Sequence, residues 1–219
     1  MKALIGHVAL NPNLAVVPDG SFLQRLRCSV SAQSCHRDID PTDSGAHPKP
    51  GLIDLHHHIL PPFYLSEVRD LMLSSWKLNS RQESYLPTRV LEWSPQNALA
   101  EMDKNGVATS VVSISIPGIW FGGAQAARTS ARKCNEYAAH LVQDHPGRFA
   151  FFASAPLPDT EGSLQEIAYA LDVLKASGFI FMTNYADKWP GDPAYALVFE
   201  ELNRLKSCVF PSERGELLP

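Results

Sequence analysis

The sequence predicts an α/β fold built on a parallel sheet, and two observations predict it. From residue 51 onward, short runs rich in apolar and β-branched residues alternate with longer stretches of helical periodicity. The strand-like runs are almost continuously apolar, which is typical of parallel strands covered on both faces. The alternation by itself does not separate a doubly wound sheet from a (β/α)8 TIM barrel.

The expected elements follow one another in the order β-α-β-α-β-α-β-α-β. The strands are expected over residues 51–55, 107–116, 149–154, 179–183 and 207–210. The helices are expected over residues 95–105, 124–143, 160–176 and 193–205, with a further short helix compatible with residues 65–73.

Turn and cap residues mark the ends of several of these elements. Ser94 is a good N-cap for the first main helix, Pro95 suits its first position, and Gly106 follows its end. Pro146 and Gly147 separate the long helix from the third strand, and Gly178 precedes the fourth strand.

Composition excludes several classes of protein. The chain has 219 residues, of which 45% are hydrophobic and 19% charged, so it is expected to be globular. The net charge of −4 is spread without a basic stripe, which argues against a nucleic-acid partner. We identify neither an apolar run long enough to span a membrane nor a signal peptide. Four scattered cysteines, in no disulfide or metal framework, favour a reducing compartment, the cytosol.

Residues 1–50 differ from the rest of the chain. They carry Pro, Ser, Asp and His without sustained periodicity, and residues 36–50 have the composition of a linker. We expect a leader or linker here, and a small functional module is the alternative.

The most informative motif is Asp54-Leu55-His56-His57-His58, directly after the first expected strand. Side chains alternate along an extended chain, so His56 and His58 are expected to point the same way and His57 the other way. Two imidazoles at this spacing can bind one divalent ion. Asp54 is expected to orient an imidazole beside the site. The alternative is a group of surface histidines with a solvated carboxylate.

In this context the chain resembles a known family. Residues 53–61 (IDLHHHILP) resemble the I-D-x-H-x-H-x-x-P opening of the amidohydrolase superfamily. Later blocks, in order, are similar to the branch of aminocarboxymuconate semialdehyde decarboxylase and the fungal 6-methylsalicylate decarboxylases. These blocks are Trp93-Ser94-Pro95, Trp120-Phe121-Gly122, Cys134-Asn135-Glu136, His145-Pro146, Phe151-Phe152-Ala153-Ser154, Tyr185-Ala186-Asp187-Lys188-Trp189 and Glu201-Leu202-Asn203.

The resemblance implies a (β/α)8 barrel, of which residues 51–210 form the N-terminal half with the first four to five β/α units. It implies metal ligation by His56 and His58 at the carboxyl ends of the strands, with zinc as the expected ion. The family pattern V-F-x-H-P at strand five is not matched, because this chain reads Val209-Phe210-Pro211-Ser212. We therefore interpret the chain as truncated, with an aberrant tail at residues 211–219, and no residue is assigned a catalytic role.

Other residues carry weaker expectations. Trp120, Phe121, Tyr185 and Trp189 follow strands two and four and are candidates to line a pocket for a flat substrate, or else to anchor loops. Lys188 or Arg89 could pair with a substrate carboxylate, although solvated charge is the simpler interpretation. Cys134, His140 and His145 are expected to be structural or solvent-facing.

The resemblance thus implies a metal-dependent non-oxidative decarboxylase of a small aromatic or muconate-type acid. Two alternatives stay open: a hydrolase of a lactone or amide that uses the same metal site, and an inactive fragment. The expected partner is a small aromatic acid, with neither nucleic acid nor membrane, and a homo-oligomer is compatible with the sequence.

Overall fold

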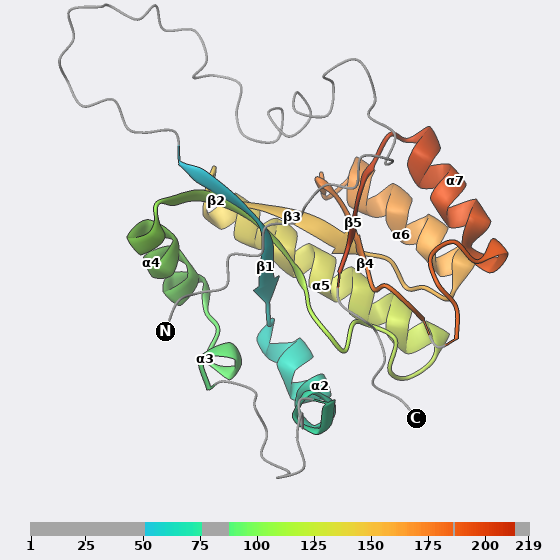
Figure 1. Cartoon of the computed structure of the whole chain (residues 1–219), viewed down its shortest axis with the longest axis horizontal. Helices are drawn as coiled ribbons and strands as arrows, with labels where there is room; N and C mark the ends of the chain where they lie inside the picture. The colour runs from blue at the N-terminus through green and yellow to red at the C-terminus, as the bar shows by residue number, and fades with distance from the viewer. Residues whose placement is uncertain (1–50, 76–87, 186, 213–219) are drawn as a thin grey trace, which may run out of the picture.

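The computed structural model describes residues 51–75, 88–185 and 187–212. Five parallel strands form one sheet in chain order (Figure 1). They are β1 (Leu52–Ile59), β2 (Val107–Ile114), β3 (Phe149–Ser154), β4 (Gly178–Phe181) and β5 (Cys208–Pro211). The expected leader at residues 1–50 lies outside the described residues. Of the expected tail at residues 211–219, Pro211 is the last residue of β5 and Ser212 follows it, and the remainder lies outside the described residues.

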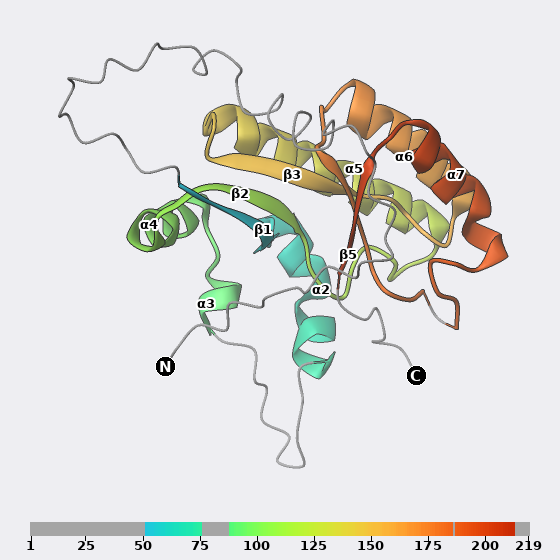
Figure 2. The same ribbon diagram turned by 45° about the horizontal axis from the view of Figure 1, so that its top comes forward.

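Helices connect the strands, and the longer ones after β2, β3 and β4 cover one face of the sheet (Figures 1 and 2). The helices are α2 (Pro62–Ser75), α3 (Thr88–Leu91), α4 (Pro95–Asn105), α5 (Ala124–Asp144), α6 (Thr160–Asp172), the 3-10 turn η2 (Pro193–Tyr195) and α7 (Ala196–Arg204). Figures 1 and 2 show α5, α6 and α7 side by side along this outer face. The main core lies between these helices and side chains such as Val112, Phe151 and Phe179.

The expected α/β order is confirmed, and most boundaries agree with the local sequence. At α4, the Ser94 hydroxyl accepts a hydrogen bond from the Asn97 amide (3.2 Å), and Gly106 closes the helix with φ 70°. Helix α6 ends at Asp172, four residues before the expected end at residue 176. The reason is that the chain turns back to the sheet, with Lys175 in the left-handed region at φ 61°.

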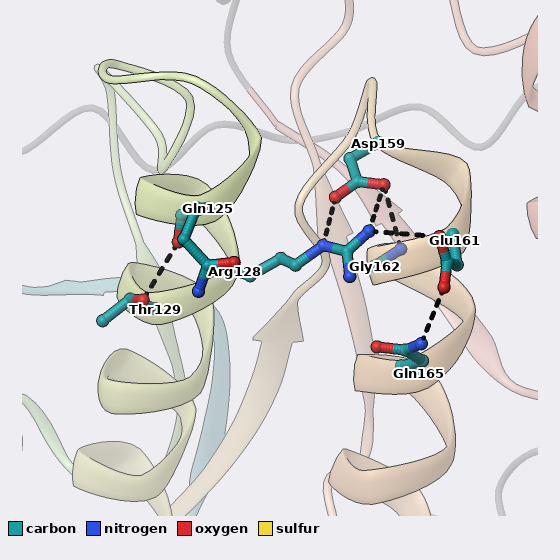
Figure 3. A network of polar contacts seen from close by, with 7 residues as sticks. All are labelled: Gln125, Arg128, Thr129, Asp159, Glu161, Gly162 and Gln165. Carbon is teal, nitrogen blue, oxygen red and sulfur yellow. Dashed lines mark hydrogen bonds and ion pairs between the residues drawn. The ribbon is translucent and has the colours of Figure 1, made fainter.

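An ion-pair network joins α5 to the start of α6. The Arg128 guanidinium, on α5, donates two hydrogen bonds to the Asp159 carboxylate, and Asp159 also caps α6 by accepting from the Gly162 amide (3.0 Å). Figure 3 shows Arg128 reaching across to Asp159 and Glu161, while Gln165 bonds Glu161 from the next turn. The network fixes the position of one helix against the next.

The sheet curls into half of a barrel. In a flat sheet, strands one and five would lie about 19 Å apart, four times the usual interstrand spacing. The His56 ring on β1 nevertheless lies 5.5 Å from the Phe210 ring on β5. Phe210 in turn stacks on Phe152 of β3, also at 5.5 Å. Side chains from alternate strands therefore share one interior layer, as in (β/α)8 barrels.

The interior of the half-barrel also holds a small apolar cluster. Val111, Ala150, Phe152 and Ile180 are buried there, against Cys208 and Phe210. By contrast, Leu52 and Ile53, at the start of β1, are 64% and 60% exposed on the edge strand. Within the described residues, we find no helix with both the length and the apolar character needed to cross a membrane.

Candidate metal centre

The three histidines lie within β1, which corrects the expectation that this strand ends at residue 55. His57 pairs with Val112 and His58 with Ser113, so the parallel ladder to β2 continues to Ile59. The expectation was wrong because three consecutive polar residues resemble a loop in sequence. In the structure, pairing with the largely buried β2 extends the strand past them.

His56 and His58 face each other on the interior side of the sheet. Their ring centroids lie 4.7 Å apart in an edge-to-face arrangement, with an interplanar angle of 85°. His57 points to the opposite, helix-covered side, where its ring lies 6.5 Å from Phe149. The alternation expected from the sequence thus holds for these three residues.

His58 is held in the uncharged form that a metal ligand requires. Burial lowers the pKa of His58 to about 4, and the neighbouring His56 and His57 contribute to that shift. The imidazole is therefore neutral at physiological pH, with a lone pair available for a cation. The Ser113 hydroxyl lies 3.4 Å from Nδ1, which leaves Nε2 as the nitrogen that would bind an ion.

Asp54 contacts His57 rather than the two facing rings. Its Oδ2 lies 3.5 Å from His57 Nδ1, and its Oδ1 accepts a hydrogen bond from the His56 amide (3.0 Å). The hydrogen bond with His57, followed by the one from the His56 amide, holds the pKa of Asp54 below its ordinary value despite partial burial. The carboxylate is therefore anionic and lies on the far side of the strand from the two candidate ligands.

The two imidazoles fit part of a coordination shell. Neutral imidazole nitrogens suit zinc, manganese and other divalent ions. Catalytic zinc usually has three protein ligands, and the described ranges 51–75, 88–185 and 187–212 hold no group of three or more His, Cys, Asp or Glu side chains arranged for a metal. His56 and His58 thus provide two candidate ligands, which we call the half-site, and their binding of a metal stays a prediction.

The four aromatic pocket candidates differ in their surroundings. Phe121 packs edge-to-face on buried Tyr64, with ring centroids 6.1 Å apart. The Tyr185 hydroxyl accepts a hydrogen bond from the Met182 amide (3.2 Å), and its ring packs on Tyr195. Trp120 is half-buried and Trp189 is 58% exposed. A substrate-binding role for these four residues stays a prediction.

The remaining candidates have structural surroundings or lie outside the description. Cys134 is buried in the main core, as expected, and burial raises the pKa of its thiol to about 12, so it is not a thiolate nucleophile at neutral pH. His145 packs on Phe149 and His140 is exposed. The Nζ atom of Lys188 lies 3.9 Å from Oδ1 of Asp187. The side chain of Arg89 is outside the described residues.

Sequence reasoning missed the interior neighbours of the histidines. Ser113 contacts His58, and Phe210 contacts His56. For Ser113, period-two alternation within β2 was the available signal, because Ser113 lies two residues after Val111.

Comparison with known proteins places this geometry in a family. The amidohydrolase family model matches residues 53–210. A decarboxylase, yanB, of Aspergillus niger is 37% identical over 166 residues, covering 72% of this chain and 42% of the relative. The 6-methylsalicylic acid decarboxylase acuB of Aspergillus aculeatus is 35% identical over 164 residues, covering 72% of this chain and 46% of the relative. The chain therefore spans about half the length of these relatives.

A solved structure supports the same assignment at the level of the fold. The dihydroxybenzoic acid decarboxylase from a Polaromonas species, solved with bound manganese and the inhibitor 2-nitroresorcinol, has a TM-score of 0.61 and 20% sequence identity. The match covers 75% of this chain and 49% of that one. The curled five-stranded sheet, the paired imidazoles on its first strand and the family match over most of the described residues lead to one conclusion: the chain belongs to the amidohydrolase family.

Proposed function

We propose that this chain supplies the first metal-binding half of a non-oxidative decarboxylase that acts on a small aromatic acid such as 6-methylsalicylate. The observation that carries the proposal is the pair of facing imidazoles, His56 and His58, on the interior side of β1. The decarboxylases among the relatives support the reaction, and the aromatic acids in their names support the substrate class.

We propose zinc as the ion, with manganese as the alternative that the Polaromonas structure suggests for its own site. A bound divalent ion supplies a Lewis acid that holds a carboxylate or phenolic oxygen and stabilises negative charge as the carbon–carbon bond breaks. His56 and His58 would hold that ion. A neutral His58 needs no deprotonation before it binds, because its pKa lies at about 4.

The interior layer beside the half-site suits a flat substrate. Phe210, which stacks on the buried Phe152, lies next to the His56 ring. Aromatic faces bind planar rings by offset stacking and exclude water from one side of them. The acid that would protonate the ring carbon is not assigned to any described residue. Two imidazoles do not complete a catalytic site, so the proposed activity needs further ligands beside this half-site.

The first experiment measures metal binding by the purified full-length chain. We expect divalent ion bound in the wild type and lost in a His56→Ala, His58→Ala double variant. His140→Ala is the matched control, because it removes an exposed histidine of α5. Equal metal binding by wild type and double variant contradicts the half-site.

The second experiment measures the reaction. The chain is mixed with the C-terminal half of the Aspergillus aculeatus 6-methylsalicylic acid decarboxylase, and carbon dioxide release from 6-methylsalicylate is followed. We expect release that depends on both His56 and His58. Hydrolysis of a lactone or amide without carbon dioxide release would favour the hydrolase alternative. Metal binding with neither product would favour a non-catalytic fragment.

A further inference from the structure

We propose that Asp54, His57 and Trp93 form a brace on the helix-covered side of β1, and that this brace positions His56 and His58 for metal binding. In this proposal Asp54 and Trp93 are positioning residues that act through the backbone of β1 and through His57. The inference rests on the proposed function, since it names residues that serve the same half-site.

The first support is an irregularity in the pairing of β1 with β2. Asp54 pairs with Ser110 and His57 with Val112, so an advance of three residues along β1 corresponds to an advance of two residues along β2. An extra residue of this kind is a β-bulge, which re-aims the side chains that follow it. Without the bulge, alternation would place Asp54 on the same side as His56 and His58. With the bulge, Asp54 shares the side of His57 instead.

The second support is the way in which the bulge is held. The Asp54 carboxylate accepts a hydrogen bond from the His56 amide at 3.0 Å. That amide belongs to the stretch where the regular pairing with β2 is interrupted. One carboxylate oxygen thus satisfies a backbone group of the bulge, and the other lies 3.5 Å from His57 Nδ1. Asp54 therefore links the backbone of one candidate ligand to the ring of the residue between the two.

The third support is the hydrogen bond that Trp93 donates to His57, because its direction fixes the tautomer of His57. The Trp93 indole has only a donor, and it donates to His57 Nε2 at 3.3 Å. Nε2 must therefore accept, so in the neutral imidazole Nδ1 carries the hydrogen and points it at the Asp54 carboxylate. Indole, imidazole and carboxylate form one chain of hydrogen bonds from the residue just before the N-cap of α4 to the backbone of β1.

This directionality allows a test that distinguishes positioning from general stabilisation. In Asp54→Asn the side-chain oxygen still accepts the hydrogen bond from the His56 amide. The new NH2 group then faces the hydrogen on Nδ1 of His57, so two donors point at each other and no hydrogen bond forms between them. In a background with Trp93→Phe, the indole donor is absent and His57 is free to move its hydrogen to Nε2. The NH2 group of the introduced asparagine can then donate to Nδ1. The double variant is therefore expected to recover the metal affinity that Asp54→Asn alone loses.

The experiment uses the full-length chain and two measurements. Nitrogen-15 NMR of the imidazoles reports the His57 tautomer, and titration with Mn²⁺ reports the affinity of the half-site. We expect the Nδ1–H tautomer in the wild type and at least about a tenfold loss of Mn²⁺ affinity in Asp54→Asn, in line with the usual effect of outer-sphere partners. We expect most of that affinity to return in the double variant, with the Nε2–H tautomer.

Ser94→Ala is the matched control for stability. It removes the N-cap of α4 next to Trp93 without touching the brace, so it should lower the melting temperature and leave Mn²⁺ affinity unchanged. The brace is refuted by an Nε2–H tautomer in the wild type, and also by an Asp54→Asn variant that melts earlier yet keeps its affinity. A wild-type chain that binds no Mn²⁺ overturns the proposed metal function itself, and the inference with it.

Discussion

Replacing Asn135 by alanine should destabilise the chain by about 3–5 kcal/mol, a range that follows from three buried hydrogen bonds. Asn135, on α5, is 2% exposed and fastens this helix to the end of β3. Its side-chain oxygen accepts from the Ser154 amide (2.8 Å), while its NH2 group donates to the Ser154 carbonyl (2.9 Å) and to Glu166 (2.9 Å). Each hydrogen bond contributes about 1 kcal/mol net, and each buried partner left without one adds a penalty of about 1 kcal/mol or more.

Urea denaturation followed by circular dichroism measures this change directly. Asn105→Ala is the matched control, because this exposed asparagine makes one hydrogen bond, to the Glu101 carbonyl, and should cost about 0.5 kcal/mol or less. Asn135→Asp keeps the shape of the side chain but places a second carboxylate beside Glu166. Burial already raises the pKa of Glu166. Two neighbouring carboxylates repel each other when both are ionised, so this variant should destabilise the chain more at about pH 8 than at about pH 5. A loss below about 1 kcal/mol in Asn135→Ala would refute the reasoning.

Three further predictions concern other sites. The pKa of His58 falls from 6.5 in the unfolded chain to about 4 in the folded one, so the unfolded state binds more protons between these two pH values. The free energy of unfolding should therefore fall as the pH drops from 6.5 to about 4. Urea titrations of a His58→Gln variant should show a shallower dependence of that free energy on pH. Asp159→Ala removes both the cap of α6 and the partner of Arg128, so it should cost about 1–2 kcal/mol, whereas Glu161→Ala, at an exposed side chain, should change the denaturation midpoint little. Gly106→Ala meets no neighbouring atom but forces φ 70° on alanine, so a loss of about 1 kcal/mol in thermal unfolding is expected, and an unchanged midpoint would contradict it.

The α/β order was predictable because each element carries its signal locally. Ser94 and Gly106 bound α4 as their capping preferences require, and the apolar runs of β2 and β3 are strands. The extent of β1 was not predictable in the same way. Pairing with β2 extends it through three histidines, and such a long-range effect has no local signature.

In the candidate site, too, local features were predictable from the sequence and long-range features were not. Alternation predicted that His56 and His58 point to the same side of the strand, because it depends only on neighbouring residues in an extended chain. The side of β1 on which Asp54 lies was not predictable, since a bulge is set by the pairing of two strands and does not show in the sequence of one of them. The contact of Phe210 with His56 joins residues at opposite ends of the described chain, so it depends on the curl of the whole sheet.

The order of the strands has a consequence for how the chain acquires its structure. Each strand pairs with the one that precedes or follows it along the chain, so every β/α unit can dock as soon as the ribosome has released it. Pairing between such close neighbours keeps the loops that must close short, which favours fast and stepwise folding. Among the described strands, β1 with its two imidazoles is synthesised first, and β2, its pairing partner, follows as the next strand. The interior contact between His56 and Phe210 requires β5, so the two imidazoles of β1 gain this aromatic neighbour only when the fifth strand is in place.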